Sequence, residues 1–179
     1  MTEYVVTRWY RAPELLLSCE TYDAAIDVWS VGCILAELLG RKPLLPGKDY
    51  IDQIKLITDV LGTPADEDLL FIQSSKARNY LKSQPHQPRK PWATLFPSAS
   101  APALDLLSQM LVFDPNKRIT VEAALKHPYL ASLHDPKLEP VCEASFEFDF
   151  EDQELKEDML RERVWDEILK FHPEPLPAK

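Results

Sequence analysis

With 179 residues, of which 45% are hydrophobic, the chain is long enough to form one domain with a buried core. Its net charge of -9 excludes the basic surface of a nucleic-acid-binding domain, so we expect no nucleic-acid partner. Its longest apolar stretch, residues 26–39, is too short and too interrupted by charges to cross a bilayer, so we expect no membrane partner. The three cysteines are widely spaced, which argues against a disulfide framework or a metal site and favours a reducing compartment.

The first helices are predicted from periodicity and from their stop signals. Residues 1–24 lack helical periodicity, so we expect an ordered loop with one helical turn over 13–17. Residues 25–39 are apolar nearly all round, which predicts a core helix ending before Gly40. The next helix is expected over 49–61, with an apolar stripe formed by Tyr50, Ile51, Ile54, Ile57 and Leu61.

The second half of the chain has weaker signals. Scattered prolines between 63 and 97 predict only short helices, near 66–72 and 75–82. Ser100 and Thr120 are the expected N-caps of helices over 101–111 and 121–126. An extended tail over 133–154 should precede a last helix over 155–171 with the stripe Leu160, Val164, Ile168 and Phe171. No segment alternates like a strand, so the predicted fold class is mainly α.

Four motifs follow one another in a specific order. Thr2-Glu3-Tyr4 leads into a segment that ends in Ala12-Pro13-Glu14, the triplet that closes the activation segment of protein kinases. Residues 27–33 (DVWSVGC), 113–118 (FDPNKR) and 127–130 (HPYL) follow at the spacing of a kinase C-terminal lobe. Three further segments, residues 46–50, 76–80 and 146–149, narrow the resemblance. Together with the four motifs, they make the chain resemble the mitogen-activated protein kinases of the Thr-Glu-Tyr type over nearly its whole length.

The resemblance implies a fold and an activity. The fold would be the C-terminal lobe of the protein kinase fold without the N-lobe β-sheet. Residues 1–130, with an insert at about 63–100, would form that lobe, and residues 131–179 a C-terminal extension with an acidic docking segment and a final helix. The whole enzyme would be a Ser/Thr protein kinase that transfers the γ-phosphoryl group of Mg-ATP to Ser/Thr-Pro sites in signalling cascades, in the cytoplasm and nucleus.

Phosphorylation and substrate binding are expected at the N-terminal end. An upstream dual-specificity MAP kinase kinase would phosphorylate Thr2 and Tyr4, although Thr2 could equally be a solvated residue of a frayed terminus. Arg8 and Arg11 match the family's phosphotyrosine-binding positions, with an exposed basic pair as the alternative. Thr7 and Arg8 match the substrate loop.

Three charged residues are expected to be structural. In the family, Glu14 and Arg118 form a buried pair that ties the activation segment to the lower lobe. Asp27 would accept backbone hydrogen bonds from the catalytic loop, so without that loop it should be hydrated or protonated.

Two docking surfaces for peptides, substrates and phosphatases are implied as well. The first is an apolar pocket for Phe-x-Phe ligands, for which core packing is an equally weighted alternative, and its residues would be Leu16, Leu17, Tyr50, Ile51, Ile54 and Tyr80. The second is an acidic patch represented by Asp135 and Glu139, where Leu138 replaces an acid that the family generally has, so basic peptides should bind more weakly. Residues 135–158 carry ten acids and two bases, which could also be only a solvated tail.

The catalytic motifs of a kinase should all precede Ala-Pro-Glu: the glycine-rich loop, the ATP-anchoring lysine, His-Arg-Asp and Asp-Phe-Gly. With that triplet at 12–14, we expect no catalytic residue here and no Mg-ATP bound by this chain alone. The alternative function is a non-catalytic interaction module that docks kinase partners. The absent lobe should also leave exposed apolar surface on residues 26–39.

Overall fold

The computed structural model describes residues 8–17, 23–142 and 156–172, and they divide into one compact unit that ends at His134 and a second unit that begins at Asp135. These residues form helices and no strand, which confirms the mainly α prediction. Thr2, Tyr4 and Thr7 lie outside the described residues. Within the described part, no helix is both long and apolar enough to cross a membrane.

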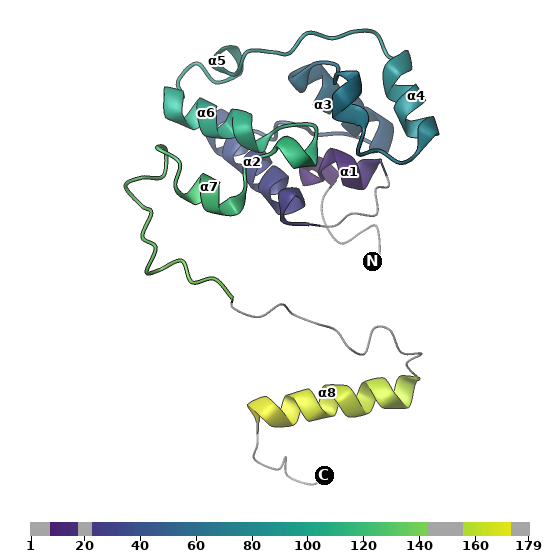
Figure 1. Ribbon diagram of the computed structural model, residues 1–179, viewed down its shortest axis with the longest axis vertical. Helices are drawn as coiled ribbons and strands as arrows, with labels where there is room; N and C mark the ends of the chain where they lie inside the picture. The colour runs from purple at the N-terminus through teal and green to yellow at the C-terminus, as the bar shows by residue number, and fades with distance from the viewer. Residues whose placement is uncertain (1–7, 18–22, 143–155, 173–179) are drawn as a thin grey trace. The chain divides into compact units, whose positions relative to one another are not determined.

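Helix α2 (Ala24–Gly40) is the centre of the first unit, and α6 (Ala101–Met110) packs along it (Figure 1). Asp23 caps α2 by accepting a hydrogen bond from the Ala25 amide. At Gly32 the two helices approach closely, because a Cβ there would lie 2.9 Å from the Leu111 side chain. The buried side of α2 includes Trp29, Cys33 and Ala36, so the core of the unit is built around this helix.

Two expectations for this central helix were wrong. The helix continues through Gly40, and Arg41 takes the left-handed C-cap position at φ 56°. Nor is it buried all round, because Val31, Ile34 and Leu38 are 50%, 49% and 72% exposed. These three residues recur at helical spacing, so they form the exposed apolar face that the resemblance predicts.

Helix α3 (Tyr50–Leu61) lies against α1 (Pro13–Leu16) and the 3-10 turn η1 (Arg8–Tyr10). Asp49 is its N-cap, because Asp49 Oδ1 accepts a hydrogen bond from the Asp52 amide, so the helix begins at Tyr50, one residue later than expected. The predicted stripe was wrong at Ile51, which is 64% exposed. Gln53 and Thr58 are buried on the inward face instead, so polar side chains complete the packing that periodicity assigned to apolar ones.

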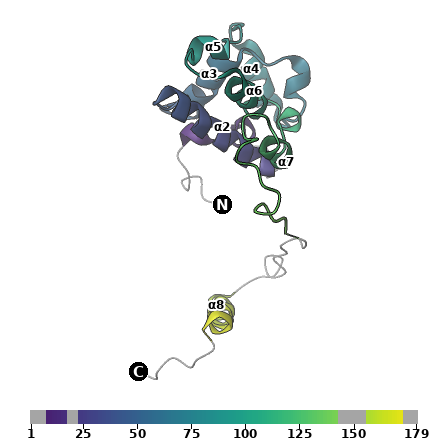
Figure 2. The ribbon, with the colours of Figure 1, turned by 90° about the vertical axis from the view of Figure 1, so that its left-hand side faces the viewer.

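The remaining elements of the first unit are short. The insert holds η2 (Asp66–Leu69), α4 (Ser75–Ser83) and α5 (Trp92–Leu95), of which α5 was not predicted. The 3-10 turn η3 (Pro115–Lys117) and α7 (Val121–Leu125) follow α6, and Ser100 and Thr120 cap α6 and α7 as expected. Figure 2 shows the same elements from the side, with α2 and α6 again adjacent.

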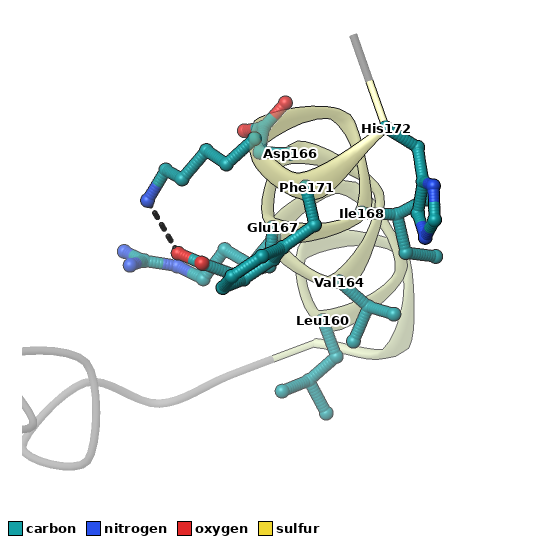
Figure 3. Close-up of a pocket in the computed structure, with 9 residues that line it drawn as sticks. Leu160, Val164, Asp166, Glu167, Ile168, Phe171 and His172 are labelled. Atoms are coloured by element: carbon teal, nitrogen blue, oxygen red, sulfur yellow. Dashed lines mark hydrogen bonds and ion pairs between the residues drawn. The ribbon is translucent and has the colours of Figure 1, made fainter.

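The second unit contains α8 (Glu157–Phe171), two residues shorter at its start than predicted. Residues 135–142, the described residues of this unit before position 156, form no helix but include a turn over 136–139, and the rest of the predicted extended tail, 143–154, lies outside the described residues. Figure 3 shows Leu160, Val164 and Ile168 along one side of α8, and an ion pair joins Lys170 to Glu167. All three apolar side chains are at least 38% exposed.

Candidate functional site

The segment from Arg8 to Glu14 is held against the compact unit by side-chain hydrogen bonds. The Trp9 indole N–H donates to the Gly47 carbonyl at 3.0 Å, and Arg8 Nη1 donates to the Lys48 carbonyl at 3.0 Å. From α2, the Ser30 hydroxyl donates to the Tyr10 carbonyl at 2.9 Å. The segment is therefore fixed at three consecutive residues, on both a loop and a helix.

Gln53 joins the same loop to this segment from inside the core. It is fully buried; its Nε2 donates to the Leu45 carbonyl at 3.0 Å and to the Trp9 carbonyl at 3.4 Å. Its Oε1 accepts from the Gly47 amide at 3.1 Å, and a Cβ on Gly47 would lie 2.3 Å from that oxygen. The sequence did not predict this role of Gln53, because a glutamine within an apolar helix stripe gives no indication of which backbone groups it will bind.

Arg8 and Arg11 both contact Tyr50, the first residue of α3. Arg11 Nη1 donates to the Tyr50 hydroxyl at 2.8 Å, and the guanidinium carbons of Arg8 and Arg11 lie 5.1 and 5.8 Å from the ring centroid. Cations over an aromatic face at this distance are attracted by its quadrupole. The two expected phosphate-binding arginines are thus gathered at one point, although Tyr4 is outside the described residues.

Tyr10 has an acidic partner. Its hydroxyl donates to Glu37 Oε2 on α2 at 2.5 Å. This hydrogen bond and partial burial raise the pKa of Tyr10 above its ordinary value, because a tyrosinate would face a carboxylate. Nearby Cys33 is buried, and burial raises the pKa of its thiol to about 12, so it stays an uncharged core residue.

Glu14 and Arg118 form a buried, two-bonded ion pair across 104 residues of sequence. Arg118 Nη1 and Nη2 each donate to one Glu14 carboxylate oxygen at 2.6 Å. Its remaining donors bind the carbonyls of Val112, Ala25 and Phe113, so all five N–H groups of the guanidinium have acceptors. The guanidinium carbon also lies 5.0 Å from the Trp29 ring centroid. This pair fixes the end of the 8–14 segment to α2 and to the loop before η3.

The expected apolar pocket is only partly at the surface. Leu16, Leu17 and Ile54 are at most 9% exposed and belong to the core, which agrees with the core-packing alternative. Tyr50 and Tyr80 are half-buried against that core, and Ile51 is exposed. A docking role for these residues stays a prediction.

The other expected residues have different surroundings. Asp27 is exposed in the first turn of α2, so its carboxylate is hydrated. In the second unit, Asp135 Oδ1 accepts from the Lys137 amide and Glu139 Oε1 accepts from the Asp135 amide, which closes a local turn. Leu138 in that turn is 78% exposed. The two acids bind backbone, so less of their acceptor capacity faces outward.

No group of three His, Cys, Asp or Glu side chains suited to a metal ion occurs among the residues that the structure describes.

Comparisons with known proteins agree on one family. The protein kinase domain model matches residues 1–130. Mitogen-activated protein kinases 2 and 6 of Oryza sativa subsp. japonica are 58% and 59% identical to the chain over 98% of its length. The mitogen-activated protein kinase homolog NTF6 of Nicotiana tabacum is 60% identical over 97% of it. These matches cover 45%, 46% and 47% of the relatives, so the chain spans about half the length of the curated relatives it matches.

Proposed function

Because this chain belongs to the protein kinase family, and within it to the mitogen-activated protein kinases, we propose that it is part of a Ser/Thr protein kinase that phosphorylates Ser/Thr-Pro sites in a signalling cascade. The observation that carries this proposal is the anchoring of residues 8–14, which by resemblance hold the substrate loop and the phosphotyrosine-binding arginines. A substrate loop has to be rigid to present a peptide in one orientation. The hydrogen bonds of Trp9 and the Glu14–Arg118 pair supply that rigidity.

A chimera tests the substrate preference. Residues 1–179 would replace the matching segment of mitogen-activated protein kinase 6 of Oryza sativa subsp. japonica, and the rest of that protein is expected to supply the catalytic motifs that precede Ala-Pro-Glu in a kinase. After phosphorylation by a dual-specificity MAP kinase kinase, the chimera should phosphorylate a Ser-Pro peptide at least ~10-fold faster than its Ser-Ala counterpart. The intact rice kinase is the control. A folded, doubly phosphorylated chimera that treats both peptides alike would contradict the proposal.

The chain by itself is proposed to be inactive, because none of the four glycines falls in a glycine-rich phosphate loop. Purified chain should show no Mg-ATP-dependent change in melting temperature and no phosphoryl transfer to a generic basic substrate. Turnover by the pure chain, at a rate that survives further purification, would refute this part of the proposal.

A second proposed role is docking of kinase partners, namely the upstream kinase, substrates and phosphatases, in the cytoplasm and nucleus. Its support is the exposed Ile51 beside half-buried Tyr50 on α3. A Phe-x-Phe peptide titrated into the chain should bind about 10-fold more weakly after Ile51→Ala, because a central apolar contact is removed. Val31→Ala on α2 is the matched control, and equal losses for both variants would argue against the docking site.

A further inference from the structure

Trp9 is held at its backbone and at its side chain by the same two residues, Gln53 and Gly47. The Trp9 carbonyl accepts from Gln53 Nε2 at 3.4 Å, and the Trp9 indole N–H donates to the Gly47 carbonyl at 3.0 Å. Gln53 Oε1 accepts from the Gly47 amide at 3.1 Å, so the three residues form a closed circuit of hydrogen bonds. A fourth bond, from Gln53 Nε2 to the Leu45 carbonyl at 3.0 Å, ties the circuit to the loop that contains Gly47.

The polar groups around Gln53 allow only one orientation of its amide. The amide nitrogen, with its two N–H donors, faces two carbonyls, whereas the amide oxygen faces an N–H. Turning the amide over would place its oxygen against two carbonyls and its nitrogen against a donor. Because Gln53 is 0% exposed, water cannot replace a lost partner. An apolar side chain at position 53 would therefore leave buried backbone groups unpaired.

Gly47 is the position at which the circuit needs a residue without a side chain. A Cβ there would lie 2.3 Å from Gln53 Oε1 and 2.8 Å from Gln53 Cα. The next residue, Lys48, is held independently, because its amide donates to Asp52 Oδ2 at 2.9 Å and its carbonyl accepts from Arg8 Nη1 at 3.0 Å. These two charged side chains bind the neighbouring backbone, so the circuit itself consists of uncharged groups.

Thr58 on the same helix shows that burial of a polar side chain does not by itself create such a link. Thr58 is 8% exposed, and its hydroxyl donates to the Lys55 carbonyl at 2.9 Å, within α3. That hydrogen bond stabilises the helix and reaches no other segment. Gln53, in contrast, binds the backbone of Trp9, 44 residues away in the sequence.

We propose that Gln53 is a positioning residue of the kinase: it sets the position of residues 8–10 and, through them, the preference for proline after the phosphoacceptor. This inference rests on the proposed function, in which Arg8 belongs to the substrate loop. Because Gln53 is fully buried, it acts through Trp9 and not on the substrate itself. A displacement of about 1 Å in a substrate-positioning segment can cost on the order of 100-fold in rate, so the circuit is short enough to matter for turnover.

The kinetic test uses the chimera described above and the variant Gln53→Met, which keeps the length of the side chain and removes the amide. The ratio of kcat/KM for the Ser-Pro peptide to that for the Ser-Ala peptide should fall at least ~10-fold, while the KM for ATP stays unchanged. Thr58→Val is the matched control and should leave the ratio unchanged. A folded Gln53→Met chimera with the ratio of the unmutated chimera would overturn the proposal.

Hydrogen exchange in the chain alone needs no kinase activity and covers the case in which Gln53→Met does not fold. The Trp9 indole N–H should exchange at least ~100-fold more slowly than that of Trp165, which is 46% exposed on α8. Gly47→Ala, whose Cβ would displace the Gln53 amide, should lower the protection of the Trp9 indole at least ~10-fold, whereas Thr58→Val should preserve it. Exchange of Trp9 as fast as Trp165, or protection that Gly47→Ala does not change, would overturn the proposal.

The two measurements separate this inference from the proposed function. An unmutated chimera without a Ser-Pro preference would refute the proposed function, and the exchange rates would still decide whether Gln53 and Gly47 anchor Trp9. Conversely, a chimera that prefers Ser-Pro equally with and without the Gln53 amide would uphold the proposed function and refute the positioning role.

Discussion

Replacing Glu14 with alanine should destabilise the first unit strongly, because it leaves the Arg118 guanidinium charged and buried. Arg118 keeps three bonds to backbone carbonyls and its position over Trp29, so it cannot easily turn toward water. It loses two 2.6 Å hydrogen bonds to the carboxylate, and both side chains are at most 3% exposed. Hydrogen bonds to charged groups contribute about 1.5–3 kcal/mol each, and breaking a buried pair costs about 3–5 kcal/mol.

The measurement is urea unfolding followed by circular dichroism, with thermal unfolding alongside. A cost of 3–5 kcal/mol corresponds to a fall in melting temperature of about 9–15 °C for a unit of this size. Lys82→Ala is the control, because it breaks the exposed Lys82–Asp66 pair and should cost less than about 1 kcal/mol.

A double variant separates the charge effect from lost packing. Glu14→Leu combined with Arg118→Leu buries no charge, so its cost should be smaller than the sum of the two single costs by at least about 1 kcal/mol. If Glu14→Ala costs no more than the Lys82 control, or if the two leucine substitutions are simply additive, the assignment of the pair as an essential buried anchor is refuted.

Three further outcomes follow from single groups. Gly47→Ala should cost about 1–3 kcal/mol in urea unfolding, because the new Cβ would lie 2.3 Å from a buried glutamine oxygen; an unchanged midpoint would contradict this. At pH 8 iodoacetamide should alkylate exposed Cys142 more than ~100-fold faster than Cys33, since a thiol of pKa about 12 has a thiolate fraction on the order of 10⁻⁴; equal rates by mass spectrometry would contradict it. Tyr10→Phe should cost about 1 kcal/mol at pH 7 through loss of the bond to Glu37. Because the pKa of Tyr10 is raised in the folded chain, its contribution to the free energy of unfolding is complete below the unfolded pKa of about 10 and is lost as the pH rises through the folded pKa. A difference in stability between wild type and Tyr10→Phe that is the same at pH 7 and pH 11 would contradict this.

Local features of the fold were predictable from the sequence because they depend on neighbouring residues. The caps at Ser100 and Thr120 each bind an amide three residues ahead, so the spacing of the sequence contains the whole interaction. The error at Ile51 has the opposite origin. The position of Ile51 in the helical period fits the apolar stripe, but whether a side chain is buried depends on which elements pack against its face of α3. Helices α1 and η1 contact α3, yet Ile51 stays exposed.

Long-range parts of the candidate site could not be derived from periodicity. Gln53 is a polar residue in an apolar helix, and its partners on Leu45 and Trp9 are set by how the loop folds back. The Glu14–Arg118 pair was reached only through the family resemblance, since no local rule joins residues so far apart. Arg8 and Arg11 were expected to bind phosphate, but their contacts with Tyr50 come from tertiary packing.

The separation of Glu14 from Arg118 also has a consequence for synthesis on the ribosome. At about 5–20 residues per second, Glu14 is made roughly 5–20 s before its partner, which lies 104 residues later. Throughout that interval the carboxylate lacks its native partner Arg118, so the two hydrogen bonds that fix the end of the 8–14 segment cannot form. Docking of the 8–14 segment through this pair is therefore completed only after Arg118 has been made.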